Sequence, residues 1–333
     1  MKFFRWLRRL VFLTVLFAAF LFYRAVRPYQ GFTGETYVEL PHGTSTGAIA
    51  DALAEAGVIG SRWDFLLARV ANRGRVLQAG EYRFDHRASP MEVFRRIARG
   101  DVFYYELVVP EGKNMFDIGA AVEQIGLFKA SEFVAAAEDP EAIRDLDPAA
   151  PTLEGYLFPD TYKLSRHTTP DKLCRIMTGK FREAWRGLHA AAPVHESVTL
   201  ASMVEKEGKL AEERPRIAGV FENRLRIGMK LDCDPTTIYA ALLTGNYRGT
   251  IYRSDLDRGH PYNTYSHPGL PPGPIANPGV ASIDAVLHPA VSDALYFVRR
   301  PDDSGAHEFS STLAAHEAAT EKYRRGIHNH KIR

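Results

Sequence analysis

The sequence predicts an α+β protein in which an N-terminal transmembrane helix precedes a small α+β module and a larger mixed α/β domain. Three observations predict this class: an uncharged run near the N-terminus, a strand–turn–helix pattern that occurs twice, and a series of amphipathic helical patterns in the second half. The 333 residues are 45% apolar and 25% charged, which is typical of an ordinary globular protein rather than a disordered or fibrous one.

Charge and cysteine content exclude several function classes. The chain has 42 basic and 40 acidic residues, a net charge of +2, so we expect no strongly basic surface for nucleic acid. The two cysteines, Cys174 and Cys233, are too few for a disulfide framework or a cysteine-based zinc site. The histidines form no pair at the spacing of helical metal ligands, and the sequence contains no glycine-rich phosphate loop and no G-x-S-x-G motif. We therefore expect no metal and no cofactor.

Residues 1–27 have the pattern of a membrane segment. Four basic residues lie within residues 1–9, residues 10–23 carry no charge, and Arg24 and Arg27 follow. This run is shorter than the roughly 20 residues that cross a bilayer, so a cleaved signal peptide and a signal anchor over residues 10–27 are both open. The bulky residues at its end provide no small-x-small cleavage site, which favours the anchor. The preceding basic residues predict a cytoplasmic N-terminus, with the rest of the chain across the membrane.

A strand–turn–helix pattern occurs at residues 38–59 and again at residues 107–128. Each copy has a short apolar strand, a Pro-x-Gly turn and an amphipathic helix that ends at a glycine. We expect the first copy to belong to a module over residues 36–104, which also has helical patterns at 63–71 and 89–99 and a strand pattern at 80–84. The larger domain is expected over residues 105–323, with a loop at the acidic, proline-containing segment 138–151, and residues 324–333 form a basic tail.

The most informative acidic residues lie in the predicted helix over residues 199–208. An apolar stripe along residues 200–204 indicates that one side of this helix is buried. Glu205 and Glu207 are about 200° apart around a helix and cannot face the same pocket. Glu205 adjoins the stripe, where an apolar wall would keep its carboxyl protonated near neutral pH and suit it to donate a proton, whereas Glu207 is expected to pair with a neighbouring lysine or solvent. The alternative is that both are solvated helix residues.

Five further residues are candidates for positioning a polar ligand. They are Asn223, Asp234, Tyr262, Asn263 and Thr264. The first lies late on a predicted helix over residues 212–226, and the second precedes a proline at a helix start, where an N-cap is the alternative. The other three lie in a loop over residues 260–278 that is rich in proline and glycine. Aromatic faces beside amides and hydroxyls suit a sugar, since pyranose rings stack on aromatic side chains and their hydroxyls need hydrogen-bond partners. A structural turn is the alternative.

Five motifs, in this order, resemble the MltG/YceG family, the endolytic murein transglycosylases of bacteria. They are LEGYLFPDTY at 153–162, ASMVEKE at 201–207, NRLRIGMKL with DPT at 223–236, PYNTY with GLPPGPI and NPG at 261–279, and GAHEFSSTLAAH at 305–316. The resemblance covers the membrane segment and nearly all of the remaining chain. It implies a LysM-like module over residues 36–104 and a YceG-like catalytic domain over residues 105–323.

The resemblance also implies an activity. It is cleavage of the β-1,4 bond between N-acetylmuramic acid and N-acetylglucosamine within peptidoglycan strands, which leaves 1,6-anhydro muramyl ends and terminates nascent strands. The family suggests an inner-membrane location, with the catalytic domain outside the cytoplasm and cell-wall synthases as partners. The first acid of the V-E-K-E motif, Glu205, is the catalytic glutamate by this resemblance, and the five residues named above are candidates for positioning the glycan.

The residues leave two other readings of function open. An ordinary glycosidase uses two carboxylates. Here Glu205 alone would protonate the glycosidic oxygen and then accept the proton of the muramyl 6-hydroxyl, which is already tethered to the sugar. A muramidase that adds water instead, and a non-catalytic peptidoglycan-binding scaffold, are the alternatives.

Overall fold

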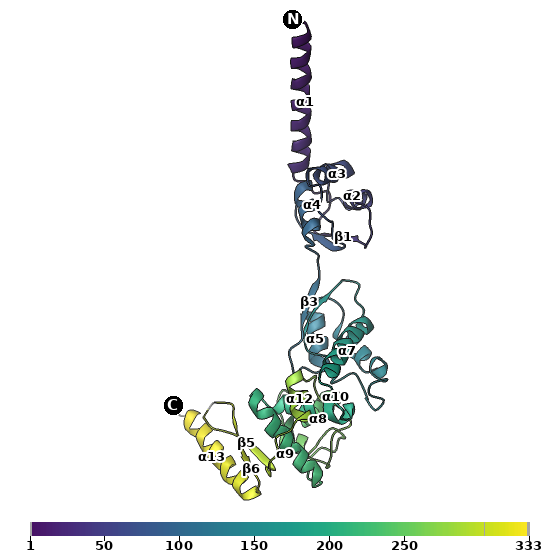
Figure 1. The fold of residues 1–333 in the computed structure, drawn as a ribbon. Coiled ribbons are helices and arrows are strands. Elements are labelled where there is room, and N and C mark those ends of the chain that lie inside the picture. Colours follow the sequence, from purple (N-terminus) through teal and green to yellow (C-terminus); the bar gives the residue numbers. More distant parts are fainter. Residues whose placement is uncertain (1, 303, 332–333) are drawn as a thin grey trace. The chain divides into compact units, whose positions relative to one another are not determined.

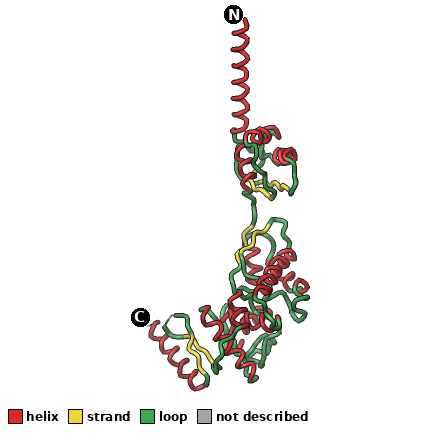
Figure 2. Tube along the Cα trace, in the orientation of Figure 1, coloured by secondary structure: helices red, strands yellow, loops and turns green. Residues whose placement is uncertain are grey.

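The computed structural model describes residues 2–302 and 304–331, and the chain divides into two compact units, residues 1–105 and 106–333. Helices predominate and the strands are short, so the protein has the mixed α+β character that the sequence predicts (Figure 2). The strands of the described residues form three separate two-stranded sheets. Met1, in the predicted cytoplasmic segment, and residues 332–333, in the predicted basic tail, lie outside the described residues.

The first helix, α1 (Lys2–Val26), is long and apolar enough to cross a membrane. Its large apolar side chains are exposed, which is unfavourable in water and compatible with a single-pass membrane anchor. Near its C-terminal end, Arg24 Nη2 lies 2.7 Å from Oδ1 of the buried Asp64. This ion pair ties the end of α1 to the rest of the first unit. The side of the membrane that each end faces stays a prediction.

The first unit packs three further helices with a small antiparallel sheet. Its elements are β1 (Thr36–Leu40), α2 (Thr46–Glu55), α3 (Arg62–Ala71), β2 (Gly80–Phe84) and α4 (Pro90–Arg99). The apolar faces of the helices meet in one core that includes Leu53, Phe65 and Phe94. Ser89 begins α4 with a capping box, which satisfies backbone N–H groups of the first turn. These elements lie where the sequence predicts them, and the LysM-like identity of the module stays a prediction.

The strand–turn–helix repeat is confirmed by the structure. Its second copy runs from β3 (Tyr105–Val108) to α5 (Met115–Gln124), as β1 and α2 do in the first copy. The turn glycines Gly43 and Gly112 have φ angles of 81° and 75°, a left-handed conformation that favours glycine. Ser45 and Asn114 then cap the two helices by accepting a backbone N–H.

The second unit is built around α8 (Val194–Glu207). Its residues from Ser197 to Val204 are all buried, so the helix is enclosed on every side rather than on one side as the sequence predicts. The helices α9 (Arg214–Arg226), α10 (Asp234–Leu243) and α12 (Val280–Leu287) pack against it (Figure 1). The remaining elements are α6 (Ala130–Ala137), η1 (Pro140–Ala142), β4 (Thr161–Leu164), α7 (Pro170–Gly187), η2 (Ala211–Glu213), α11 (Arg253–Leu256), β5 (Tyr296–Arg299), β6 (His307–Ser310) and α13 (Leu313–Lys331). The last helix includes the described part of the predicted tail.

The proline- and glycine-rich loop before α12 is irregular, as predicted, and Asn277 attaches it to two other segments. Asn277 Oδ1 accepts the backbone N–H of Leu157 at 2.8 Å, and its Nδ2 donates to Glu154 Oε1 at 2.7 Å and to the Lys113 carbonyl at 2.8 Å. The Met115 N–H, in the first turn of α5, donates to the other oxygen of Glu154 at 2.9 Å. Glu154 is fully buried, and this burial raises its pKa to about 8, so the carboxyl holds a proton at neutral pH.

Replacement of Glu154 by glutamine is expected to change both the stability and its dependence on pH. The amide turns N–H groups toward one of the two donors that reach the carboxyl, so we expect a loss of about 1–3 kcal/mol near pH 5. The pKa of the wild-type carboxyl is about 8 in the folded protein against its ordinary value of 4.5, so wild-type stability falls as the pH rises between these values. The free energies of unfolding of the two proteins, measured in urea, should therefore approach each other between about pH 5 and about pH 8. A constant difference would contradict the buried, protonated carboxyl.

Candidate functional site

Glu205 lies near the end of α8, with its carboxylate enclosed by three donors. Its side chain is only 6% exposed. Arg214 Nη2 donates to Oε1 at 3.1 Å, while the Gly279 backbone N–H and the Ser282 hydroxyl donate to Oε2 at 3.1 and 2.7 Å. Hydrogen bonds to an ionised acceptor are stronger than neutral ones, and a guanidinium adds its charge. The two carboxylate oxygens are therefore held in fixed positions.

The three donors come from the N-termini of two helices. Arg214 is the first residue of α9, and the preceding Glu213 accepts the backbone N–H of His307 at 2.9 Å, which fixes this helix start to β6. Gly279 is the N-cap of α12, and Ser282 lies in its first turn. The carboxylate thus occupies the helix end at which the backbone dipoles favour negative charge.

The turn between β3 and α5 packs against the same glutamate. A Cβ atom at Gly112 would lie 3.4 Å from Glu205 Cγ, which is van der Waals distance. Lys206 Nζ donates to the Gly112 carbonyl at 3.1 Å, and the Gly112 N–H donates to the Asn277 carbonyl at 2.9 Å. The second copy of the repeat therefore supplies one wall of the candidate site.

The prediction of an apolar wall around Glu205 is wrong. The groups that reach the carboxylate are a guanidinium, a hydroxyl and a backbone amide. The periodicity of α8 indicates which of its faces is buried, but it carries no information on the distant segments that cover that face. The polar character of the site comes from those segments.

Glu207 faces a different environment from Glu205, as the helical spacing predicts. The Cys233 thiol donates to Glu207 Oε1 at 3.4 Å, and burial raises the pKa of Glu207 to about 7. Burial also raises the pKa of the Cys233 thiol, which keeps it protonated and able to donate. The predicted pairing of Glu207 with a neighbouring lysine or with solvent is therefore wrong.

Asn263 and Thr264, two of the predicted positioning residues, are buried in the loop that contains them. Asn263 is 1% exposed, and its Nδ2 donates to three backbone carbonyls within residues 255–258 at 2.7 to 3.3 Å. Thr264 is fully buried, and its Oγ1 accepts the Cys233 backbone N–H at 3.0 Å. These side chains organise the loop, and direct contact with a ligand stays a prediction.

The other three predicted residues lie in different places. Asn223 Nδ2 donates to backbone carbonyls of residues 292 and 294, both at 2.9 Å, and so holds the segment that leads to β5. The ring of Tyr262 is buried beside Tyr239, with 5.1 Å between centroids. Asp234 is exposed and accepts the Tyr265 hydroxyl at 2.6 Å. The interpretation of Asp234 as an N-cap is wrong, because α10 begins at this residue.

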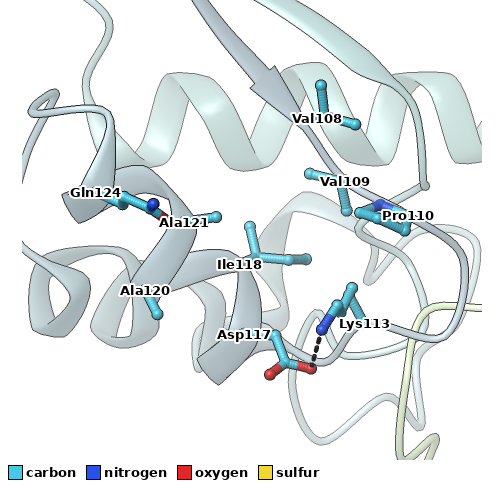
Figure 3. A pocket seen from close by; sticks show the side chains of 9 residues that line it. All are labelled: Val108, Val109, Pro110, Lys113, Asp117, Ile118, Ala120, Ala121 and Gln124. Atoms are coloured by element: carbon cyan, nitrogen blue, oxygen red, sulfur yellow. Dashed lines mark ion pairs between the residues drawn. The ribbon is translucent and has the colours of Figure 1, made fainter.

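A pocket of about 300 Å³ adjoins the β3–α5 turn (Figure 3). Val109, Pro110 and Ile118 give it an apolar lining, and an ion pair between Lys113 and Asp117, at 3.7 Å, lies at its edge. Glu205 is not among its lining residues, so the pocket and the glutamate share the turn but not a surface. Among residues 2–302 and 304–331, His, Cys, Asp and Glu side chains form no cluster of three that could hold a metal ion.

Four residues around the carboxylate were not predicted from the sequence. They are Glu111, Arg214, Gly279 and Ser282. Two sequence signals were available. Glu111 lies in the repeated Pro-x-Gly turn, and the other three residues lie at predicted helix starts, Arg214 before Pro215 and Gly279 and Ser282 after the proline-rich loop. Neither signal shows that these segments meet at one carboxylate.

The sequence profile of the YceG-like family matches residues 38–322. The chain belongs to the YceG-like family. It is 32% identical over 307 residues to a Bacillus subtilis (strain 168) protein named endolytic murein transglycosylase, which covers 86% of this chain and 84% of that protein. A Streptococcus pneumoniae (strain D39) protein of the same name is 30% identical over 78% of this chain, which spans 53% of that longer protein.

A solved structure agrees with these relatives. The crystal structure of a putative yceG-like protein from Listeria monocytogenes is 30% identical, with a TM-score of 0.54, and the alignment covers 86% of this chain and 99% of that one. The predicted family and the predicted enzyme class, lytic murein transglycosylase, are confirmed by these comparisons. The YceG-like match includes every segment that contacts Glu205.

Replacement of Asn263 by alanine is expected to destabilise the second unit by about 2–4 kcal/mol, because it leaves several buried carbonyls without their donor. The matched change Asn246→Ala, at an exposed asparagine, is expected to alter stability by less than about 0.5 kcal/mol. Thermal and urea unfolding of both variants measure the difference. An Asn263→Ala protein as stable as Asn246→Ala would show that this amide does not organise the loop.

Proposed function

We propose that this chain is an endolytic murein transglycosylase that cleaves the β-1,4 bond between N-acetylmuramic acid and N-acetylglucosamine within glycan strands. Its products carry 1,6-anhydro muramyl ends. Glu205 is the acid–base group of the reaction. The observation that carries this proposal is the position of its carboxylate, held by three donors where α8, α9, α12 and the β3–α5 turn meet. The names of the relatives support the substrate class.

The reaction uses one carboxyl group twice. Protonated Glu205 donates its proton to the glycosidic oxygen as the bond from the muramyl anomeric carbon to that oxygen breaks. The carboxylate then accepts the proton of the muramyl 6-hydroxyl, whose oxygen forms the new bond to the anomeric carbon. Since this hydroxyl belongs to the same sugar, its attack gains from proximity and needs no water.

The donors around Glu205 suit the second half of this cycle. When the proton has left, Arg214, Ser282 and the Gly279 N–H stabilise the resulting carboxylate and fix its orientation. These groups are in place before the reaction, so no reorganisation is needed as the charge appears. The Glu205 side chain has little exposure, so the groups around it exclude solvent water from the reacting centre. This favours the internal hydroxyl as nucleophile.

The N-terminal helix supports the proposed location. Anchored by α1 in the inner membrane, the enzyme acts on the extracytoplasmic side, where it meets nascent strands beside the cell-wall synthases. Cleavage of a strand during its synthesis ends its elongation. Residues 36–104 of the first unit form a LysM-like module that precedes the catalytic domain. Asn223, Asp234, Tyr262, Asn263 and Thr264 act on glycan binding through the segments that they hold in place by the contacts described above.

Glu205→Gln is expected to lower the release of anhydro-ended muropeptides from purified sacculi by roughly 100- to 10,000-fold, because it keeps the shape of the side chain and removes the transferable proton. The matched control is Glu207→Gln, two residues away on the same helix and facing Cys233, which should stay within about threefold of wild type. The detergent-solubilised full chain is used, and mass spectrometry identifies the products.

Three outcomes of that digestion contradict the proposal. Wild-type activity in Glu205→Gln would remove the assigned acid–base group. Products heavier by one water would identify a muramidase. Binding of sacculi with no released muropeptide would identify a scaffold protein.

Ser282→Ala is expected to lower kcat by roughly 10- to 100-fold, because the 2.7 Å hydrogen bond to Glu205 Oε2 is lost while the volume changes little. KM should change less, since Ser282 is fully buried and contacts the glutamate rather than the substrate. Steady-state kinetics on isolated glycan strands measure both constants. An unchanged kcat would show that this donor does not act in the reaction.

A further inference from the structure

Glu111 lies in the β3–α5 turn, directly before the glycine that packs on Glu205. The turn is fixed by hydrogen bonds: the Gly112 N–H donates to the Asn277 carbonyl at 2.9 Å, and Asn277 Nδ2 donates to the Lys113 carbonyl at 2.8 Å. The backbone directly after Glu111 is therefore held in place. Its carboxylate reaches the same guanidinium as Glu205.

Arg214 is shared between the two carboxylates. Its Nη2 lies 3.1 Å from Glu205 Oε1 and 3.7 Å from Glu111 Oε2, and the guanidinium is largely buried. The two carboxylate oxygens are therefore at most about 7 Å apart, a separation at which paired carboxyl groups act on a glycosidic bond in other glycosidases. The two glutamates differ in their access to solvent, because the side chain of Glu111 is 49% exposed and that of Glu205 is 6% exposed.

Gly279 leaves the space that the Glu111 carboxylate occupies. A Cβ atom at this position would lie 1.8 Å from Glu111 Oε1, far inside contact distance. The backbone of Gly279 has φ −77° and ψ 168°, which any residue adopts, so conformation does not require glycine here. The absence of a side chain at Gly279 leaves room for the Glu111 carboxylate in its present position, and the N–H of the same residue donates to Glu205.

We propose that Glu111 is a second catalytic carboxylate of this site, facing the muramyl ring and stabilising the positive charge that develops at the anomeric carbon. This inference rests on the proposed function. Cleavage of a glycosidic bond passes through an oxocarbenium-like transition state, which a nearby anion stabilises. Glu111 forms no bond and transfers no proton, so the proton balance at Glu205 is unchanged. Arg214 holds both anions in place and offsets the repulsion between them.

Glu111→Gln tests this role with the full-length, detergent-solubilised enzyme and isolated glycan strands. Because the side chain is half exposed and its charge is partly screened, kcat is expected to fall by roughly 10- to 100-fold, with a smaller change in KM. Glu111→Asp keeps the charge and should restore part of kcat. The melting temperature should stay close to wild type, which separates loss of charge from loss of fold.

Gly279→Ala is the second variant. It keeps both glutamates and the N–H that Glu205 accepts, and it displaces the Glu111 carboxylate, so its kcat should fall as in Glu111→Gln. If Glu111→Gln does not fold, this variant and Glu111→Asp decide the question. A wild-type kcat in Glu111→Gln, or in Gly279→Ala, overturns the inference while Glu205→Gln stays inactive. Activity in Glu205→Gln instead overturns the proposed function itself.

Discussion

The candidate site depends on the hydrogen bonds of Asn277. Its side chain joins the Leu157 N–H, the Glu154 carboxyl and the Lys113 carbonyl, and its own backbone N–H and carbonyl bond to Lys113 and Gly112. One buried residue thus uses its side-chain amide and its backbone groups to bind two other segments, residues 112–113 and 154–157, which lie 120 to 165 positions away in the sequence. Such a network is rigid when every member is satisfied and costly when one is removed. It fixes the β3–α5 turn at the distance from α12 that Glu205 requires.

Two carboxyl groups lie at helix N-termini in this network, and their surroundings make them different. Glu154 receives donors from Met115 and Asn277, and no cation among the residues that the structure describes pairs with it, so burial dominates and raises its pKa to about 8. Glu205 receives the guanidinium of Arg214 as well as neutral donors. A neutral buried acid contributes to structure at little electrostatic cost, while a carboxylate beside a cation forms charge-assisted hydrogen bonds. The same residue type therefore has two different surroundings, and the proposed chemistry lies at the one that includes a cation.

Local patterns in the sequence predicted the helices near residues 63–71 and 89–99, the strand over residues 80–84 and the strand–turn–helix repeat. They failed where the answer lay in distant contacts. The donors to Glu205 come from 9 to 77 positions away, and no periodicity reports them. Asn263 and Thr264 have the chemistry of sugar ligands, but the loop folds back on itself and uses that chemistry internally. The sequence of a loop shows which polar side chains it contains. Only the folded path of the loop shows which of them remain free to bind a ligand.

The repeat shows how the same backbone can serve two purposes. Gly43 and Gly112 have nearly the same φ, so the residue before each glycine occupies the same point of its turn. In the first copy this residue is His42, which is exposed, and in the second it is Glu111, which reaches Arg214. The geometry of the turn is set by the glycine and by the helix cap that follows it, whereas its chemistry is set by what packs against it. Because the Asn277 network holds the second turn against α8 and α12, a carboxylate at that point enters the site. The copy at the candidate site is therefore distinguished by its tertiary contacts rather than by its local fold.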